Sequence, residues 1–341
     1  MFIYFYCVLL LLYRVPREVY IMIQLDQRPL GASTVVVPAL GVGIWSWGDK
    51  RIWGYGQNYT QDDVFQAYKT CLDAGLNFFD TAEMYGQGES ERLLGECHRR
   101  DDRPIIIASK FAPLPSRFSA RSLLTALDNS LERLGVQSID LYQIHWPYTW
   151  LNMHELMDML AEAVRSGKVR AVGVSNYSAN QMHKAYERLA RHDVPLASNQ
   201  VHYSLLHRKP ESNGVLATCR ELNVALIAYS PLEQGLLTGK FRPNQPQSVQ
   251  VSGPRRYSRA FSAKRRQQME PLFQAMETIA QAHGKTIGQV ALNWLMTKDA
   301  HIIPIPGAKN MRQASENAGA IGWHLSEPEM CRIDQSAQEW L

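Results

Sequence analysis

Short apolar runs alternate with longer stretches of helical periodicity from about residue 40 to the carboxyl terminus. Each apolar run predicts a buried strand. The runs lie near residues 40–44, 77–80, 105–109, 139–144, 169–174, 197–200, 224–229 and 302–305. The stretches between them carry apolar positions on one helical face and predict helices, among them residues 61–74, 90–99, 119–134, 152–166 and 179–191. This alternation is typical of repeated βα units rather than of separate sheet and helix domains.

Eight strands that are each followed by a helix predict a closed parallel barrel, the (β/α)8 or TIM barrel of the α/β class. The alternative is a doubly wound sheet, which would place a Gly-x-Gly-x-x-Gly turn after its first strand. Here Gly41-Val42-Gly43 is followed by Ile44-Trp45-Ser46, and no third glycine completes that turn. A barrel typically needs about 250 residues plus insertions, so the 341-residue chain is predicted to hold a single barrel domain over residues 22–341.

The sequence also predicts additions to a bare barrel. Residues 232–261 are rich in Gly, Pro, Gln and Arg and are too many for an ordinary connection, so we interpret them as a loop that folds over a cofactor. A helix pair at residues 271–283 and 286–298 precedes the last strand. Residues 328–340 predict a carboxyl-terminal helix, which Ser326 and a glutamate three residues later would cap.

The composition is that of a chain able to bury a large core, with 45% hydrophobic and 20% charged residues. The 36 Lys and Arg residues exceed the 32 Asp and Glu residues by four, which does not indicate a nucleic-acid partner. The five cysteines form no Cys-x-x-Cys pair, so neither a disulfide framework nor a zinc site is indicated. The ten histidines lack the His-Glu-x-x-His spacing, and we expect no metal. This cysteine usage favours a reducing, cytoplasmic location.

Residues with acid–base chemistry follow three of the predicted strands. Asp80 ends the second strand, and Tyr85 lies five residues further on. Lys110 follows the third strand and His145 the fourth. The carboxyl ends of parallel strands meet at one rim of a barrel, so these four side chains are expected to converge. Taken alone, each could be a turn residue or a helix cap.

Such a convergence would make a proton donor for carbonyl reduction. A phenol with a pKa of about 10 holds its proton too tightly to be a good acid at neutral pH. The Lys110 ammonium would lower the pKa of Tyr85, and Asp80 would keep that lysine charged and oriented. His145 could donate a hydrogen bond to the oxygen of a carbonyl substrate.

The same residues lie in segments that resemble the aldo-keto reductase family. The resemblance covers residues 40–339 and looks closest to the plant, algal and cyanobacterial oxidoreductases of that family, including plastid types. It rests on residues 77–86 and 89–91, and on residues 108–110, 140–147, 173–177, 198–200 and 305–309. The resemblance implies that Asp80, Tyr85, Lys110 and His145 form a catalytic tetrad, with the tyrosine as general acid.

The resemblance also implies NADPH as cofactor, lying across the barrel rim. Ser175 and Asn176 follow the fifth strand and Gln200 ends the sixth, where their side chains can bond the amide of the nicotinamide. Tyr229 ends the seventh strand and could stack on that ring. On local grounds Ser175-Asn176 could equally be a helix-capping turn. The implied cofactor contacts are Gly43, Ile44, Trp45, Asp80, Ser175, Asn176, Gln200, Tyr229, Ser230, Pro231, Leu232, Gly307, Lys309, Gln313, Glu316 and Asn317.

The phosphate end of the cofactor is expected beyond the last strand. Residues 306–309 are predicted to open a helix, and free N–H groups at a helix start favour negative charge. In another branch of the family an arginine binds the 2′-phosphate at the position that Gln313 occupies here. Lys309, with Arg312 as a second cation, is therefore the expected charged partner of that phosphate.

Aromatic residues of the loops after strands one, two and four are expected to line the substrate cleft. They are Trp45, Trp47, Tyr85, Trp146, Tyr148 and Trp150, and Trp47, Trp146 and Tyr148 are the assigned substrate contacts. Such a cleft suits an aldehyde or ketone with a flat or apolar body. We therefore expect an NADPH-dependent reductase that converts an aldehyde or ketone to an alcohol, acting as a monomer or weak homo-oligomer.

Two alternatives stay open. A regulatory protein that holds the same cofactor, as the potassium-channel beta subunits of this family do, would bind NADPH tightly without turning over aldehydes. An unrelated barrel hydrolase or isomerase would not consume NADPH when offered a carbonyl compound.

The amino-terminal residues 1–21 differ from the rest of the chain. Residues 2–13 are an unbroken apolar and aromatic run followed by Arg14 and Arg17. The run is shorter than the about 20 residues of a spanning helix and lacks the basic start and cleavage site of a signal peptide. Residues 22–25 resemble the start of the hairpin that caps the barrel in this family, so we interpret residues 1–21 as an over-extended gene model. A membrane anchor is the alternative, and the plastid stroma is the alternative location if the source is a photosynthetic eukaryote.

Overall fold

The computed structural model describes residues 26–243, 251 and 257–340. Eight strands of this part form one parallel sheet in which neighbours in sequence are neighbours in space. In sheet order they are β3 (Val42–Gly43), β4 (Phe78–Asp80), β5 (Ile106–Phe111), β6 (Ile139–Ile144), β7 (Val169–Ser175), β8 (Leu196–His202), β9 (Ala225–Tyr229) and β10 (Ile302–Pro304). Each strand lies on one of the predicted apolar runs, so the strand predictions are confirmed.

The sheet closes on itself because its first and last strands also bond each other. The Gly41 N–H donates to the carbonyl oxygen of Pro304 at 3.0 Å, and the Gly43 N–H donates to that of Pro306 at 3.1 Å. A Cβ atom on Gly43 would lie 2.8 Å from the carbonyl oxygen of Ile305, so this close approach requires a glycine. The closed ring of strands is the predicted (β/α)8 barrel.

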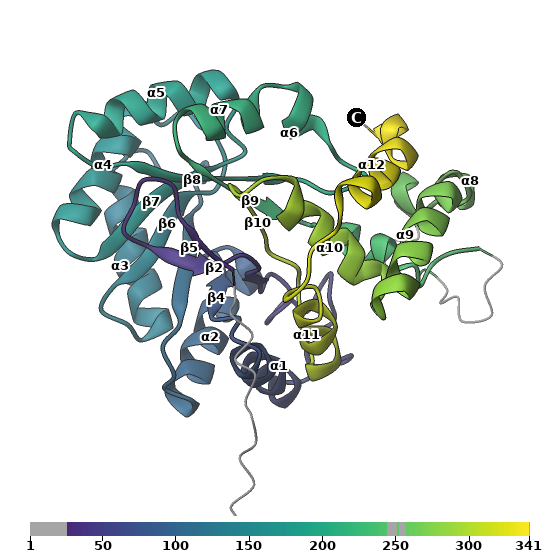
Figure 1. Cartoon of the computed structure of the whole chain (residues 1–341). Helices are drawn as coiled ribbons and strands as arrows, with labels where there is room; N and C mark the ends of the chain where they lie inside the picture. The colour runs from purple at the N-terminus through teal and green to yellow at the C-terminus, as the bar shows by residue number, and fades with distance from the viewer. Residues whose placement is uncertain (1–25, 244–250, 252–256, 341) are drawn as a thin grey trace, which may run out of the picture.

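Helices surround the strands on the outside of the barrel (Figure 1). They are α1 (Gln61–Asp73), α2 (Glu89–Arg100), α3 (Ser122–Leu134), α4 (Met153–Arg165), α5 (Ala179–Ala190), α6 (Lys209–Ser212), α7 (Val215–Glu221), α8 (Ala263–Gln268), α9 (Glu270–His283), α10 (Ile287–Lys298), α11 (Met311–Ala318) and α12 (Glu327–Ser336). Short 3-10 turns are η1 (Tyr85–Gly88), η2 (Glu233–Thr238), η4 (Arg259–Phe261) and η5 (Gln338–Trp340). The sequence pattern did not predict α6, α7 and α8, because four, seven and six residues give too little periodicity.

Local capping signals explain where several helices begin and end. Four helices start with a capping box, in which the residue before the helix and the residue at its third position bond each other's backbone. These N-caps are Thr60, Ser178, Thr286 and the predicted Ser326. Gly135 ends α3 with a φ of +69°, a left-handed conformation that glycine adopts without strain.

A two-stranded hairpin of β1 (Gln27–Pro29) and β2 (Val36–Pro38) covers one end of the barrel (Figure 1). Three buried side chains of the hairpin, Leu30, Val35 and Val37, pack with the barrel interior. Their partners include Phe78 and Ala225, which are the first residues of their strands, so the covered end is the amino-terminal one. The predicted site residues lie at the opposite, carboxyl-terminal rim. Residues 2–13 and 22–25, on which we made predictions above, lie outside the described residues.

The last barrel helix starts later than the sequence suggested. It begins at Met311, with Asn310 as the cap whose side chain accepts from the Gln313 N–H at 3.0 Å. Gly307 and Lys309 therefore lie in the loop before α11 and not in its first turn, which corrects the prediction. The long segment after β9 contains η2 and η4, and part of it lies outside the described residues.

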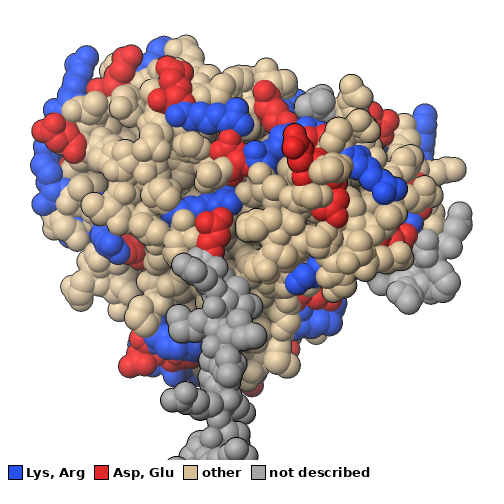
Figure 2. Space-filling model, viewed as in Figure 1, with Lys and Arg blue, Asp and Glu red and all other residues tan. Residues whose placement is uncertain are grey.

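Positive and negative side chains are interspersed on the hairpin-bearing face of the molecule (Figure 2). No single-sign patch dominates this face, in line with the small net charge of +4. Within the described ranges no helix combines the length and apolar character that crossing a membrane requires.

Candidate active site

The four predicted catalytic residues lie at the carboxyl-terminal rim, at or just after the ends of neighbouring strands. Asp80 is the last residue of β4, and Lys110 is the second-last residue of β5. His145 directly follows β6, and Tyr85 opens η1, five residues after Asp80. Because β4, β5 and β6 are adjacent in the sheet, the residues at their carboxyl ends meet on one side of the barrel mouth.

Lys110 is at the centre of the contacts among these side chains. Its Nζ lies 2.5 Å from Oδ1 of Asp80, 2.7 Å from the carbonyl oxygen of Thr81 and 3.4 Å from the Tyr85 hydroxyl. Lys110 is fully buried and Asp80 is 2% exposed, a setting that is costly for either charge alone. Burial acts to lower the pKa of Lys110, but Asp80 and Tyr85 outweigh it and raise that pKa overall. The lysine is therefore an ammonium beside the phenol.

Asp80 is also fixed by two buried amides. Its Oδ2 accepts from Nε2 of Gln200 at 2.8 Å and from Nε2 of Gln143 at 3.4 Å. Gly173 leaves room for these side chains, since a Cβ there would lie 2.2 Å from the Ser198 hydroxyl and 3.2 Å from Gln143. Gln143 was not predicted as a site residue, although a polar residue inside an otherwise apolar strand is a signal of a buried hydrogen bond.

Opposing effects act on the Tyr85 hydroxyl. Burial is the largest and raises the pKa of the phenol, Lys110 lowers it, and Asp80 raises it. The net pKa is raised from the ordinary value of 10.0, which is opposite to the direction expected from the lysine contact alone. The physical reason is that desolvation of the phenolate outweighs its attraction to the ammonium. Tyr85 consequently keeps its proton at neutral pH, as a proton donor must.

His145 is a neutral imidazole next to that phenol. Burial, reinforced by the Lys110 charge, lowers the pKa of His145 to about 3. Its ring centre lies 5.6 Å from that of Tyr85, with the planes at 78°. Its Nδ1 is buried and has no hydrogen-bond partner among the described residues. The neutral ring carries one N–H, so it can donate one hydrogen bond to a bound oxygen atom.

A hydrogen-bonded row of groups continues along the rim from these residues. The Ser175 hydroxyl donates to the backbone carbonyl of Gln200 at 2.8 Å, and Asn176 Nδ2 donates to the Ser175 hydroxyl at 3.0 Å. The Tyr229 hydroxyl donates to Oδ1 of Asn176 at 3.0 Å. Asn176 has a φ of +62°, a left-handed conformation that often marks functional sites. The structure therefore brings the four predicted nicotinamide-side residues together.

Hydrogen bonds join the residues predicted for the phosphate end, two in the loop before α11 and two in α11 itself. The backbone N–H of Lys309 donates to Oε1 of Gln313 at 3.1 Å, and Asn317 Nδ2 donates to the carbonyl of Gly307 at 3.1 Å. These bonds fix the loop that carries Lys309 against the helix that follows it.

Aromatic rings flank the Lys309 ammonium. Its Nζ lies 4.9 Å from the centre of the Tyr59 ring and 5.9 Å from that of Trp53, within range of a cation–π contact. Glu316 is exposed and pairs with Arg312 at 2.6 Å. Arg312 is thus engaged on the helix surface, whereas Lys309 is partly buried.

The other predicted cofactor contacts lie where the first and seventh barrel strands end. Gly43, Ile44 and Trp45 follow one another at the end of β3. Ser230, Pro231 and Leu232 directly follow Tyr229, the last residue of β9. The Ile44 N–H donates to the backbone carbonyl of Asp80 at 2.9 Å, which fixes the first of these segments next to Asp80.

The aromatic residues predicted for the substrate cleft differ in how exposed their side chains are. Trp45 and Trp146 are partly exposed, with ring centres 6.4 Å from Tyr85 and 4.8 Å from His145 respectively. Tyr148 is 82% exposed, at the outer edge of the rim. Of the six aromatic residues predicted for the cleft, Trp45 and Trp146 therefore lie next to Tyr85 and His145.

The structure corrects the prediction that Trp47 contacts the substrate. Its side chain is fully buried, its indole N–H donates to the Ala308 carbonyl at 2.8 Å, and its ring packs against Phe79. It therefore stabilises the packing of the first strand's loop on the segment after β10 and does not line a cleft. The buried Trp47 and the partly exposed Trp45 look alike in sequence, because loops lack a regular period.

A comparison of the whole chain with known proteins identifies the family to which this site belongs. The profile described as "Aldo/keto reductase family" matches residues 39–338. The chain belongs to the aldo/keto reductase family. It is 38% identical over 319 residues to pyridoxal reductase, chloroplastic, of Arabidopsis thaliana, covering 89% of this chain and 84% of that protein. It is 31% identical over 326 residues to L-glyceraldehyde 3-phosphate reductase of Escherichia coli K12, covering 92% of both.

Solved structures of aldo-keto reductases share the fold of this chain. One from Klebsiella pneumoniae in complex with NADPH has a TM-score of 0.71 and 26% identity, covering 91% of this chain and 95% of that one. Another from the same organism, in complex with NADP and acetate, has a TM-score of 0.69 and 28% identity, covering 88% and 92%. The protein is therefore an oxidoreductase with an aldo-keto reductase barrel, as the sequence resemblance implied.

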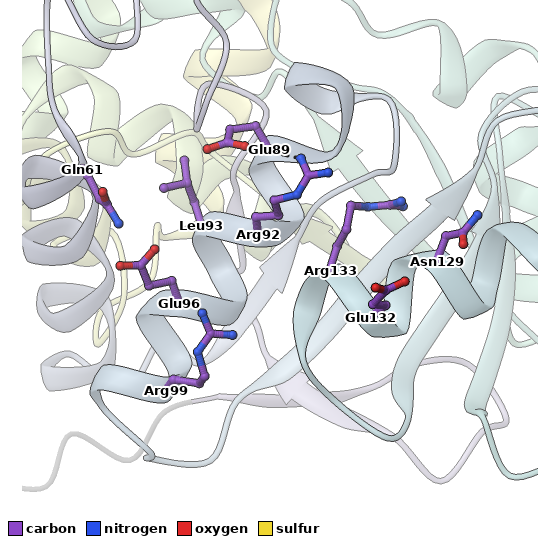
Figure 3. Close-up of a pocket in the computed structure, with 9 residues that line it drawn as sticks. All are labelled: Gln61, Glu89, Arg92, Leu93, Glu96, Arg99, Asn129, Glu132 and Arg133. Atoms are coloured by element: carbon purple, nitrogen blue, oxygen red, sulfur yellow. Dashed lines mark hydrogen bonds and ion pairs between the residues drawn. The ribbon is translucent and has the colours of Figure 1, made fainter.

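A polar groove also runs between α1, α2 and α3 on the outside of the barrel (Figure 3). It is lined by Gln61, Glu89, Arg92, Leu93, Glu96, Arg99, Asn129, Glu132 and Arg133. Its arginines alternate with glutamates, and Arg133 is held by the buried Glu91 at 2.6 Å. The groove contains none of the rim residues described above, and its mixed charges do not favour a ligand of one sign. Among the described residues, no group of three or more His, Cys, Asp or Glu side chains is arranged to hold a metal ion.

Proposed function

We propose that this protein reduces an aldehyde or ketone to an alcohol with NADPH. The observation that carries the proposal is the contact between the buried Lys110 ammonium and the Tyr85 hydroxyl, 3.4 Å apart, beside the neutral His145. The family membership and the NADP and NADPH complexes of the solved neighbours support the choice of reaction and cofactor.

Tyr85 donates the proton in this mechanism. Reduction turns the carbonyl oxygen into an alkoxide-like oxygen, which is a much stronger base than a phenolate and takes the phenol proton. Negative charge then develops on the Tyr85 oxygen, 3.4 Å from the Lys110 ammonium. The ammonium is already in place and stabilises that charge without reorganisation. The effect of Lys110 is therefore largest at the moment of proton transfer.

His145 orients the substrate. A neutral imidazole N–H and the phenol O–H are both able to donate to one carbonyl oxygen, which fixes its position and draws electron density from the carbonyl carbon. Asp80 acts through Lys110, because its carboxylate at 2.5 Å keeps the lysine charged and directed at Tyr85. It is a positioning residue in this scheme.

The donor groups along the rim fit a nicotinamide. Asn176 and Ser175 supply an amide and a hydroxyl group in one row, Gln200 adds the side-chain amide that also bonds Asp80, and Tyr229 supplies a flat ring with which to stack. When bound, the cofactor supplies a hydride to the carbonyl carbon. Lys309 is the cation we assign to the 2′-phosphate, with Gly307, Gln313, Glu316 and Asn317 around the adenosine end. Gly43, Ile44, Trp45, Ser230, Pro231 and Leu232 complete the proposed contacts.

The substrate class that we favour is a flat, apolar or aromatic aldehyde. Trp45 and Trp146 lie next to Tyr85 and His145, where they would cover the body of such a molecule. The Arabidopsis relative carries the name pyridoxal reductase. Pyridoxal, a ring aldehyde, is therefore the first substrate to test.

The test is a carbonyl screen with the purified protein. Pyridoxal, benzaldehydes and short aliphatic aldehydes are each mixed with NADPH, and the loss of NADPH absorbance is followed together with alcohol formation. The proposal predicts stoichiometric NADPH loss, with faster turnover of ring aldehydes than of aliphatic ones. Tight NADPH binding without turnover of any aldehyde would instead support the cofactor-holding regulatory alternative. Failure to bind NADPH would exclude both.

A further inference from the structure

A column of three stacked rings stands behind the proposed nicotinamide site. The ring of His202, the last residue of β8, lies 5.3 Å from the Tyr229 ring, with the planes only 12° apart. On its other face His202 stacks on His207 at 3.9 Å and 10°. His202 thus covers one face of the Tyr229 ring.

A carboxylate from the loop after β9 forms a hydrogen bond with His202, the middle ring of this column. Oε1 of Glu233 lies 2.6 Å from Nε2 of His202 and accepts from the Ser204 hydroxyl at 2.6 Å. His202 and Ser204 belong to the end of β8 and the turn after it, whereas Glu233 opens η2, three residues beyond the proposed cofactor contact Ser230. The contact therefore joins two segments that both carry proposed cofactor residues.

The backbone conformation of the loop after β9 must be stabilised by contacts with other parts of the chain. Ser230, Glu233 and Gln234 have φ values of +53°, +48° and +53°, in the left-handed region that side chains disfavour. Left to itself, a loop with three such residues relaxes to other conformations, so contacts from outside the loop must hold it. The two hydrogen bonds to the Glu233 carboxylate are contacts of this kind.

We propose that His202 and Glu233 are positioning residues for the cofactor, a role that rests on the function proposed above. His202 supports the Tyr229 ring from behind, so that its other face is flat and fixed where the nicotinamide stacks. Glu233 holds the loop from Ser230 onward in the conformation that contacts the cofactor. The two roles are separable, because one uses the face of the imidazole and the other uses its Nε2.

Two substitutions at one position separate these roles. His202→Phe keeps a flat ring behind Tyr229 but loses the bond to Glu233, so we expect NADPH to bind about tenfold more weakly, with kcat changed by less than about threefold. His202→Gln keeps an N–H for Glu233 but loses the ring, so the loss is expected mainly in kcat. Glu233→Ala removes the bond with His202 and the bond from Ser204, so it should weaken NADPH binding at least as much as His202→Phe does.

The double variant His202→Phe with Glu233→Ala provides the second readout. The bond that His202→Phe removes is already absent in Glu233→Ala, so the double variant should bind NADPH no more weakly than Glu233→Ala alone. His183→Phe is the matched control, because His183 pairs with Glu221 at 3.6 Å on the exposed outer helices, away from the rim. It should leave NADPH binding and kcat at the wild-type values.

The outcomes are distinct. If wild-type protein binds NADPH but His202→Phe and Glu233→Ala both bind it within about twofold of wild type, the positioning roles are wrong while the proposed function stands. Lower melting temperatures with unchanged NADPH binding and kcat would mean that the His202–Glu233 contact is only structural. If the losses multiply in the double variant, the two residues act independently and the proposed role of their bond is disproved. If the wild-type protein does not bind NADPH, the proposed function fails and this inference fails with it.

Discussion

At the scale of single residues, the candidate site depends on burial as much as on charge. Asp80 and Lys110 compensate each other at 2.5 Å, so that an ammonium persists in a fully buried position. The same burial keeps the Tyr85 proton in place and the His145 ring neutral. The site is thus set with its proton on the phenol and its positive charge on the lysine before any substrate arrives.

The lowered pKa of His145 predicts the shape of the pH profile. With a pKa of about 3, His145 stays neutral at every pH above that value, so its ionisation should not affect kcat/KM between about pH 5.5 and pH 8. The measurement is kcat/KM for an active aldehyde across that range. An acid limb centred near the ordinary histidine pKa of 6.5, absent in His145→Gln, would show that the ring ionises normally.

The sequence predicted which residues meet at the rim, because strand ends can be located from apolar runs. It did not predict the direction of the pKa of Tyr85, because desolvation depends on depth, which a linear pattern does not contain. It also assigned Trp47 to the cleft, whereas the structure buries that side chain completely. Charge pairs between strand ends can be inferred from sequence, but the packing of loop side chains cannot. The catalytic role of the four residues stays a prediction.

At the scale of elements, the start of α11 changes how the phosphate end is understood. The helix was expected to open at residues 306–309, but Asn310 caps it and Lys309 lies in the loop before it. Periodicity locates a helix but fixes its first residue poorly, because any of several polar residues can serve as cap. Lys309 is held there by its backbone bond to Gln313 and by the aromatic rings around its ammonium.

The position of Lys309 predicts a difference between the two nicotinamide cofactors. A charged hydrogen bond contributes about 1.5–3 kcal/mol, roughly ten- to a hundredfold in affinity. We expect Lys309→Ala to weaken NADPH binding by at least about tenfold and NADH binding hardly at all, because only NADPH carries the extra phosphate. Fluorescence titration with both cofactors gives the two dissociation constants.

Arg312→Ala is the control for this prediction, because Arg312 is exposed and pairs with Glu316 on the helix surface. It should change neither dissociation constant by more than about twofold. Equal losses for NADPH and NADH in Lys309→Ala would mean that the lysine supports the loop instead of binding the phosphate.

At the scale of the whole molecule, the hairpin and the barrel form one folding unit. The buried Arg28 of β1 donates to the carbonyl oxygens of Ile302 at 2.5 Å and Met296 at 2.7 Å, and pairs with Asp26 at 3.1 Å. The hairpin is thus bonded to the last strand and the helix before it. Asp26, the first described residue, is the most amino-terminal residue in these contacts.

A chain that begins at Met22 is therefore predicted to fold and act like the full chain. It keeps Asp26, Arg28 and all of β1, so the bonds that hold the hairpin on the barrel are retained. We expect its urea midpoint to match that of the full chain and its kcat/KM to lie within about twofold. A lower midpoint would show that residues 1–21 contribute to the fold. Recovery of the native full-length protein with membranes would instead support an anchor.

The central claim is that Tyr85 donates the proton, and Tyr85→Phe tests it most directly. The change removes one hydroxyl and keeps the ring that packs between Trp45 and His145. General acid catalysis is worth about a hundredfold to ten-thousandfold, so kcat for the best aldehyde should fall by at least about a hundredfold while the dissociation constant of NADPH stays within about twofold of wild type. A Tyr85→Phe variant that keeps more than about a tenth of the wild-type kcat would show that another group is the acid.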